Sequence, residues 1–231
     1  MLSTPVTSQL RLKEFQDVYE PAEDTFALLD ALEKDAKKLR QMAEMKNLLT
    51  AEIGCGSGCA SSFLKSGILK NKPIVHFMSD ISNSACRASK ITALNNRELY
   101  KDDNGLFITV QTSFLDGIRL GNGVDILIFN PPYVPTEFEE IPSEAATIAS
   151  AWAGGTDGMD VTSTLLNQLK DILSQDGVFY MVAVARNKLH SICEILQKDG
   201  FIVNETLKRK AGRETLSILR IYRIGNTIWD E

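Results

Sequence analysis

The sequence predicts an α/β protein built on a seven-stranded, doubly wound and mostly parallel sheet, with a helical extension before the first strand. Seven short apolar runs alternate with amphipathic stretches of helical length, which is the pattern of strands joined by crossover helices. The apolar runs are 48–53, 73–78, 106–110, 124–129, 177–184, 201–207 and 215–222, and the helical stretches lie near 58–69, 83–97, 160–173 and 187–199.

The two ends of the chain complete this prediction. Only Lys208 to Glu214 separates the last two apolar runs, which is too short for a crossover helix, so these strands should pair antiparallel. From Glu23 to about Met45, apolar residues recur at helical spacing and predict helix. Residues 1–17 are polar and aperiodic and predict a flexible tail. Because no composition break marks a second domain, 18–231 should be a single domain.

The composition describes an acidic globular protein. Of the 231 residues 44% are hydrophobic and 24% are charged, and the net charge at pH 7 is −5. A non-specific grip on duplex nucleic acid normally needs a basic face, so none is expected here. No apolar segment reaches the length of a signal peptide or membrane span. The cysteines lack metal or redox spacing and only two histidines are present. We therefore expect no metal site and a reduced, cytoplasmic protein, with nuclear presence also allowed.

A glycine-rich loop follows the first strand. In Glu52-Ile53-Gly54-Cys55-Gly56-Ser57-Gly58 the three glycines let the backbone turn sharply and approach a ligand. A dinucleotide fingerprint would need glycine at Cys59, so the spacing favours a nucleoside ligand without a pyrophosphate. A tight strand-to-helix turn is an equally good explanation of the loop alone. Asp80, at the end of the second strand run, is placed to accept both ribose hydroxyls, although it could also cap the next helix.

The fourth strand run ends in Asn130-Pro131-Pro132-Tyr133. Two prolines cannot continue a sheet, which is the purely structural explanation. The same residues suit the methylation of a planar NH2 nitrogen, which is a poor nucleophile and must be held in line with the methyl donor. The Asn130 side-chain oxygen and the Pro131 carbonyl can each accept one N–H bond, and proline holds both acceptors rigid. Tyr133 can stack on the flat face of the acceptor.

These residues resemble the class I amino-methyltransferases that carry an (N/D)PP(Y/F) motif, and more narrowly the eukaryotic branch of the HemK-like release-factor glutamine methyltransferases. The resemblance extends from Val18 to about Tyr222. Besides the glycine loop and Asn130-Pro131-Pro132-Tyr133, it rests on Val18-Tyr19-Glu20-Pro21-Ala22-Glu23-Asp24-Thr25, on Ala151-Trp152-Ala153-Gly154-Gly155-Thr156-Asp157-Gly158 and on Lys210-Ala211-Gly212-Arg213-Glu214-Thr215-Leu216-Ser217. It implies a Rossmann-like class I methyltransferase fold with strand order 3-2-1-4-5-7-6.

The resemblance also implies a cofactor and a set of site residues. The cofactor would be S-adenosyl-L-methionine, and the acceptor would be the glutamine of a Gly-Gly-Gln loop in the class I translation termination factor, held by Asn130, Pro131, Pro132 and Tyr133. The residues expected at the cofactor are Thr25, Glu52, Gly54, Gly56, Gly58, Asp80, Ser113, Phe114 and Asn130. Ser113 departs from the family, which usually has aspartate there, so cofactor affinity could be weaker.

Members of this family resemble one another in needing a partner, a small zinc-binding activator subunit. In the implied strand order, Leu106–Gln111 lies at the edge of the sheet. It is apolar and contains no lysine to discourage pairing. We therefore expect the activator to add to this strand, unless the protein's own loops cover it.

Several alternatives remain at the level of sequence. An adenine N6 methyltransferase acting on DNA or RNA fits the same tetrapeptide but lacks a basic groove or recognition domain. A lysine acceptor would need a base, and a non-catalytic binding protein would not need Asn130-Pro131-Pro132-Tyr133. The acidic stretch 137–144 could gate the substrate, and the basic residues 208–210 with Arg213 could meet a partner. Both are more simply solvated charges.

Overall fold

The computed structural model of the chain describes residues 2–132, 159–184, 189–212 and 214–230. Its strands are β1 (Leu49–Ile53), β2 (Val75–Asp80), β3 (Leu106–Gln111), β4 (Val124–Phe129), β5 (Leu173–Val184), β6 (Phe201–Ala211) and β7 (Glu214–Arg223). Its α-helices are α1 (Glu23–Lys34), α2 (Ala36–Met45), α3 (Cys59–Ser62), α4 (Asn83–Tyr100), α6 (Asp160–Ile172) and α7 (Leu189–Lys198). Three shorter turns are η1 (Ser8–Arg11), η2 (Lys13–Phe15) and the π-helical η3 (Phe63–Ile68).

The strands form one seven-stranded sheet in the order β3-β2-β1-β4-β5-β7-β6. The first five are parallel, and β7 is antiparallel to both β5 and β6. The predicted order and the antiparallel final pair are confirmed. In the register, Ile53 lies between Ser79 of β2 and Phe129 of β4. The residues that follow these three positions therefore meet at one edge of the sheet.

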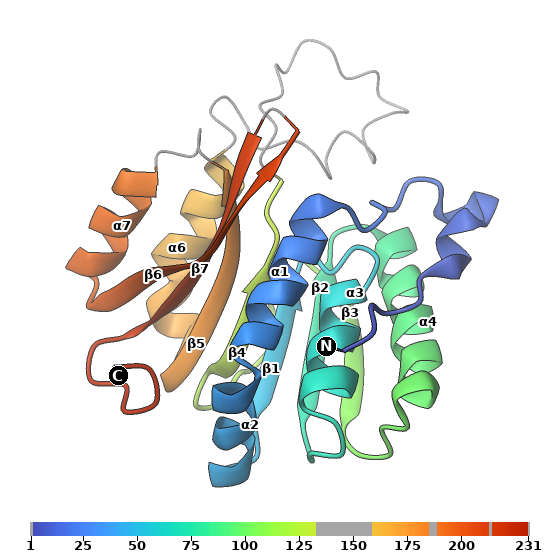
Figure 1. Ribbon diagram of the computed structural model, residues 1–231, viewed down its shortest axis with the longest axis horizontal. Coiled ribbons are helices and arrows are strands. Elements are labelled where there is room, and N and C mark those ends of the chain that lie inside the picture. Colours follow the sequence, from blue (N-terminus) through green and yellow to red (C-terminus); the bar gives the residue numbers. More distant parts are fainter. Residues whose placement is uncertain (1, 133–158, 185–188, 213, 231) are drawn as a thin grey trace.

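Helices cover both faces of the sheet (Figure 1). On one face, α1, α2, α3 and η3 pack against β4, β5 and β7 around a core that includes Leu28, Leu64 and Tyr180. On the other, α6 and α7 pack against the same strands around Leu169, Phe179 and Leu196. Next to α3, α4 lies over β2 and β3. The β6–β7 hairpin projects past the rest of the sheet at the edge where the parallel strands end (Figure 1).

The single helix expected over 23–45 is divided at Asp35. The carboxylate of Asp35 accepts the Tyr180 hydroxyl at 2.8 Å and both of its oxygens accept from Arg220 Nη1 at 2.9 Å. Asp35 is buried, and a buried carboxylate must be paired in this way to offset its desolvation. The polar cluster therefore fastens the helical extension to β5 and β7 at the residue where α1 ends and α2 begins.

Residues 2–17, which we expected to be a loose tail, lie against α4. Phe15 is fully buried and Leu10 nearly so, in a small cluster with Ala85 and Ala88. The Val6 amide donates to Asn96 Oδ1 at 2.7 Å and its carbonyl accepts from Asn96 Nδ2 at 2.8 Å. Leu10 and Phe15 alone give no periodic signal in the sequence. Their contact with α4, which is distant in sequence, could therefore not be predicted from the local pattern. No helix among the described residues is long and apolar enough to cross a membrane.

Candidate active site

A cavity of about 450 Å³ lies at the carboxyl ends of β1, β2 and β4. In parallel α/β sheets ligands bind at this edge, near the point where the strand order reverses. Strands β2 and β4 lie on opposite sides of β1, so β1 is that point here. Among the lining residues are Asp17, Tyr19, Asp24, Thr25, Glu52, Gly54, Gly56, Asp80, Ile81, Ser113, Phe114, Asn130, Pro131, Pro132 and Asp160.

The glycine loop turns through backbone conformations that favour glycine. Gly56 has φ +46 and its N–H donates to Asp80 Oδ2 at 3.0 Å. Gly58 has φ +74, and a Cβ there would come within 2.7 Å of the Ser89 Cα on α4. Gly58 is not among the lining residues. Gly58 lets the loop pack against α4, whereas Gly54 and Gly56 line the cavity.

Asp80 links the loop to the next helix and still faces the cavity. Its Oδ1 accepts from the Ser82 N–H at 2.9 Å, and Ser82 rather than Asp80 caps α4 by accepting from the Ala85 N–H. Burial raises the pKa of Asp80, against backbone hydrogen bonds that lower it. Each carboxylate oxygen can accept a second bond, so Asp80 can hold a ribose diol while it fixes the loop.

Glu52, the last residue but one of β1, is buried at the start of the loop. One oxygen, Oε2, accepts from the Ser61 N–H at 2.8 Å and lies in close contact with the Ser61 hydroxyl. Desolvation by burial raises the pKa of Glu52 to about 8, and Asp80 adds to the shift, while the bonds from Ser61 oppose it. A carboxyl group in this state can bind a ligand either as a neutral donor or as an anion.

Asn130 follows β4 and is held by the helix that begins at Glu23. Its Nδ2 donates to Asp24 Oδ2 at 2.9 Å. Asp24 Oδ1 accepts from the Tyr19 hydroxyl at 3.0 Å and from the Thr25 N–H at 2.7 Å. An ionised carboxylate only accepts hydrogen bonds, so the amide of Asn130 must turn its NH2 group toward Asp24. Its Oδ1 is buried and has no hydrogen-bond partner among the described residues.

Asp24 and Tyr19 line the cavity, and the sequence prediction named neither of them as a site residue, although the resemblance implies that their segment covers the cofactor. An acid in the first turn of a helix is usually explained by the helix dipole, which hides a second role. The available signal was its position beside Thr25 in the segment that carries the family resemblance. Thr25, Ser113, Phe114, Pro131 and Pro132 lie in the cavity wall as expected. Tyr133 and the stretches 137–144 and 151–158 fall outside the described residues.

The cavity wall carries negative and not positive charge. Its described lining residues include five acidic side chains, those of Asp17, Asp24, Glu52, Asp80 and Asp160, and no lysine, arginine or histidine. Phosphate-bearing ligands favour positive side chains or helix N-termini. The wall instead suits a cationic ligand with a nucleoside. Within the described part of the chain, no three His, Cys, Asp or Glu residues are grouped as metal ligands.

Comparison with known proteins places the chain among methyltransferases, although no protein-family model matches it. The human methyltransferase HEMK2 is 37% identical over 220 residues, which cover 94% of this chain and 95% of that protein. The release factor glutamine methyltransferase of Aquifex aeolicus is 25% identical over 73% of this chain and 57% of its own length. Among solved structures, the E. cuniculi Mtq2–Trm112 complex, described as methylating the eRF1 translation termination factor, superimposes with a TM-score of 0.61. That match has 21% identity and covers 90% of this chain and 99% of the other, so it supports the fold.

Proposed function

The chain belongs to the HEMK2 family of methyltransferases, and from that premise we propose that it methylates the side-chain amide nitrogen of a glutamine in the class I translation termination factor. The cofactor we propose is S-adenosylmethionine. The names of the relatives support the acceptor, since the Aquifex aeolicus protein is a release factor glutamine methyltransferase and the E. cuniculi complex acts on eRF1.

The observation that carries this proposal is the unpartnered Asn130 Oδ1 in the cavity wall. A buried acceptor without a partner costs about 1–3 kcal/mol, so its presence indicates a ligand donor that is absent from the protein itself. A glutamine NH2 offers two N–H groups in one plane. Asn130 Oδ1 can accept one of them, and the Pro131 carbonyl is the candidate acceptor for the other.

The protein contributes alignment and electrostatics to the reaction. S-adenosylmethionine, when bound, would supply the electrophilic methyl carbon on a sulfonium. Asp24 fixes the plane of the Asn130 amide, and Asn130 in turn fixes the acceptor nitrogen. As the new N–C bond forms, the bond between the methyl carbon and the sulfonium sulfur would break to leave a neutral thioether, and the acceptor amide would lose one N–H proton to solvent. No dedicated base is required, because an alkylated amide cation is a strong acid.

The remaining cofactor contacts follow from the charge of the cavity. Asp80 would take the ribose hydroxyls, and Thr25 and the backbone of Gly54 would hold the amino-acid end of the cofactor. The carboxylates of the wall would stabilise the positively charged sulfonium of the cofactor more than the uncharged thioether of the product. Ser113 is exposed at the cavity wall, and its hydroxyl can bond the adenine amino group without adding charge.

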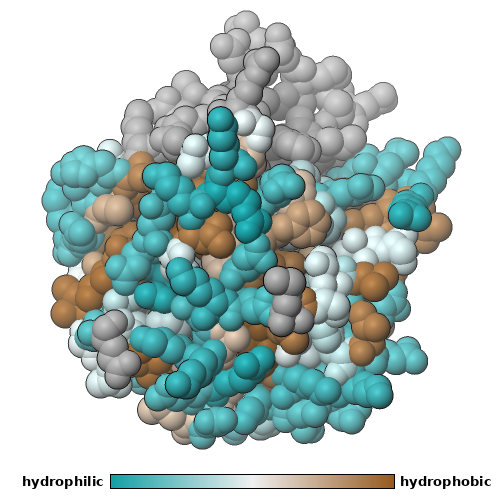
Figure 2. Space-filling view, in the orientation of Figure 1, coloured by the Kyte–Doolittle hydropathy of each residue, from teal (hydrophilic) through white to brown (hydrophobic). Residues whose placement is uncertain are grey.

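We also propose that a small zinc-binding activator subunit binds along β3. This strand is at the sheet edge, and Leu106 at its start is 53% exposed. Leu94 and Leu99 of the neighbouring helix α4 are exposed as well, and Figure 2 shows hydrophobic residues among the hydrophilic ones on that side of the molecule. An unpaired, apolar edge strand is a template for strand addition. The Trm112 partner of the E. cuniculi protein supports the existence of such a subunit.

The test is an acceptor assay with labelled S-adenosylmethionine. The purified chain, with and without the activator, is incubated separately with the termination factor, with the factor whose Gly-Gly-Gln glutamine is replaced by glutamate, and with DNA or RNA. We expect label only in the unmodified termination factor. Label confined to nucleic acid, or label on a lysine of the substituted factor, would overturn the assignment.

A further inference from the structure

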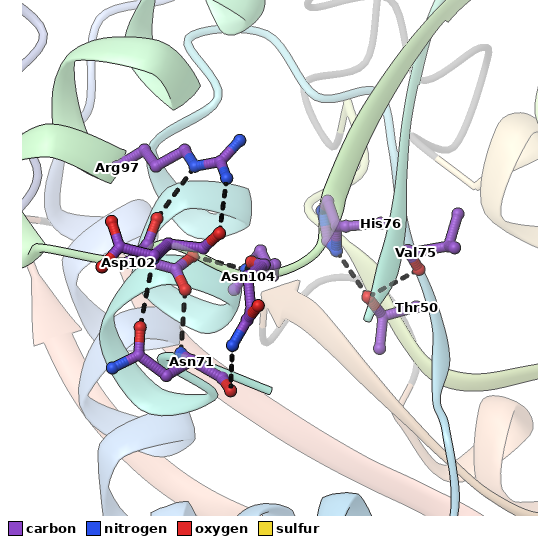
Figure 3. Close-up of polar contacts among 9 residues, drawn as sticks. Thr50, Asn71, Val75, His76, Arg97, Asp102 and Asn104 are labelled. Atoms are coloured by element: carbon purple, nitrogen blue, oxygen red, sulfur yellow. Dashed lines mark hydrogen bonds and ion pairs between the residues drawn. The ribbon is translucent and has the colours of Figure 1, made fainter. Parts of the chain in front are cut away.

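A line of buried polar side chains runs from the first strand to the cavity. Thr50 Oγ1 is 2.7 Å from His76 Nδ1, and His76 Nε2 is 2.8 Å from Ser61 Oγ. Ser61 in turn contacts Glu52 Oε2 with both its hydroxyl and its N–H. Figure 3 shows the Thr50 end, where Oγ1 lies between the His76 ring and the Val75 carbonyl, 3.5 Å away. Thr50, Ser61 and His76 are fully buried.

His76 is uncharged in this environment. Burial and the positive charge of Lys65 lower its pKa to about 3. The rings of His76 and Phe107 of β3 make an edge contact, with their centroids 5.6 Å apart. The ammonium of Lys65 lies over the Phe107 ring, 5.8 Å from its centroid. Lys65 is itself paired with Asp102. The imidazole is therefore neutral and carries one N–H.

The groups around Glu52 favour its protonated form when the cavity contains no cation. The charge of Asp80, which ends β2 and also lines the cavity, raises the pKa of Glu52. Cys55 and Cys59 flank it, and burial keeps the pKa of both thiols above the usual value. No described basic side chain lines the cavity beside Glu52.

The hydrogens available on these side chains allow two arrangements of this hydrogen-bond chain, one in which every donor points toward Glu52 and one in which every donor points away from it. Each hydroxyl has one hydrogen and the neutral imidazole has one N–H. If Glu52 is ionised, the Ser61 hydroxyl donates to Glu52, His76 Nε2–H donates to Ser61, and Thr50 donates to Nδ1. If Glu52 carries a proton, it donates to Ser61, Ser61 donates to Nε2, Nδ1–H donates to Thr50, and Thr50 turns to the Val75 carbonyl.

We propose that His76 is a positioning residue for the cofactor. Together with Ser61 and Thr50, His76 forms a reversible hydrogen-bond chain that donates to Glu52, so that Glu52 meets the bound cofactor as an anion. The two arrangements differ by one proton, which leaves Glu52 for solvent, and by the ring nitrogen that carries the imidazole hydrogen. The ionised arrangement adds a hydroxyl donor to the backbone donor from Ser61, and the cationic cofactor supplies the charge that stabilises it. The inference rests on the proposed function only for the identity of the cofactor.

The tautomer of His76 tests this directly. The chain has two histidines, so ¹⁵N-labelled imidazoles give two sets of signals, and His190→Gln identifies those of His76. Without cofactor we expect the Nδ1–H form at about pH 6 and the Nε2–H form at about pH 10, on either side of the Glu52 pKa. Saturating S-adenosylmethionine at about pH 6 should produce the Nε2–H form. The same tautomer under all three conditions would overturn the proposal.

Cofactor affinity gives a second readout. Since binding selects the anion, affinity should rise about tenfold per pH unit toward pH 8 and then level off. His76→Phe, which cannot donate to Ser61, should weaken binding about tenfold or more. His76→Gln keeps an N–H for Ser61 and should restore most of the affinity. Calorimetric titration of the chain, with His190→Gln as the matched control, measures each value. Equal affinity and equal pH dependence in His76→Phe and the unmodified chain would contradict the role.

The two proposals fail in distinguishable ways. If the chain shows the tautomer change with S-adenosylmethionine but methylates an acceptor other than glutamine, the inference on His76 stands and the acceptor assignment fails. If glutamine is methylated and the tautomer never changes, the reverse holds.

Discussion

Asp24 Oδ2 accepts the Asn130 Nδ2–H at 2.9 Å, and this contact joins the start of α1 to the end of β4. The bond decides which end of the Asn130 amide faces the cavity. Both oxygens of Asp24 are used as acceptors, Oδ1 by Tyr19 and Thr25 and Oδ2 by Asn130. Asp24 is therefore placed to act through Asn130, as a positioning residue for the acceptor.

Replacing Asp24 should lower turnover while leaving the cofactor bound. Asp24→Asn would point an NH2 group at the NH2 of Asn130 or force the Asn130 amide to rotate, so we expect kcat to fall about 10–100-fold, the range for a lost positioning hydrogen bond. In Asp24→Ala, kcat should fall by at least as large a factor. Steady-state kinetics and calorimetry on the same preparations separate kcat from cofactor affinity.

Glu23→Gln is the matched control for Asp24→Asn, because Glu23 is the exposed neighbour in the same helical turn. It should retain turnover within about twofold, since surface substitutions of this kind change little. Full activity in Asp24→Asn would show that the carboxylate does not orient Asn130.

The edge strand gives a prediction about the partner. Leu106→Lys should weaken binding of the activator about tenfold or more, because a lysine on an edge strand discourages strand addition. Leu12→Lys makes the same change at a residue of nearly equal exposure, 52% against 53%, which directly follows η1 and is not part of the sheet. It should bind the activator normally. Equal binding by both variants in a pull-down or calorimetric titration would place the partner elsewhere.

The buried ion pair of Lys65 and Asp102 should matter to stability. Both side chains are almost fully buried, and Asp102 also accepts from the Asn71 N–H at 2.8 Å (Figure 3). Lys65→Met leaves an unpaired buried carboxylate, so the free energy of unfolding should fall by about 3–5 kcal/mol. Lys72→Met removes a half-exposed lysine whose Nζ lies 3.7 Å from Glu44 Oε1. This substitution should change the free energy of unfolding by less than about 1 kcal/mol. Chemical denaturation compares the two, and similar losses would show that the buried pair has no special role.

The buried neutral state of His76 predicts an acid-dependent stability. Its pKa is about 3 in the folded protein and near 6.5 when unfolded. The stabilisation is therefore complete above about pH 6.5 and is lost as the pH falls toward 3, at up to about 1.4 kcal/mol per pH unit. Glu52, whose pKa is raised, acts in the opposite direction between about 4.5 and 8. The difference between the unmodified chain and His76→Gln isolates the histidine, and it should shrink on acidification. A difference independent of pH would contradict the assignment.

Much of the fold follows from local patterns in the sequence. The alternation of apolar runs fixed the strands, and the short link between Lys208 and Glu214 identified the antiparallel pair. Gly54 and Asn130 were recognisable because glycine spacing and the tetrapeptide carry chemistry in adjacent residues. These signals depend on near neighbours, so a single sequence displays them.

Other features depend on contacts between distant residues and could not be predicted. Asp24 and Asn130 are 106 positions apart, and neither shows in the sequence that it selects the orientation of the other. The burial of Phe15 depends on α4, and the role of His76 depends on hydroxyls contributed by β1 and α3. The loop pattern identifies Gly58, but the close approach of Ser89 of α4, which leaves no room for a Cβ there, does not show in that pattern.

The effect of Asn130→Ala on cofactor affinity and on turnover, measured in one preparation with the termination factor as acceptor, tests the central claim most directly. Because Asn130 Oδ1 is assigned to the acceptor nitrogen, S-adenosylmethionine should bind within a few-fold of its normal affinity while turnover falls about 100-fold or more. Turnover equal to that of the unmodified enzyme would contradict the account.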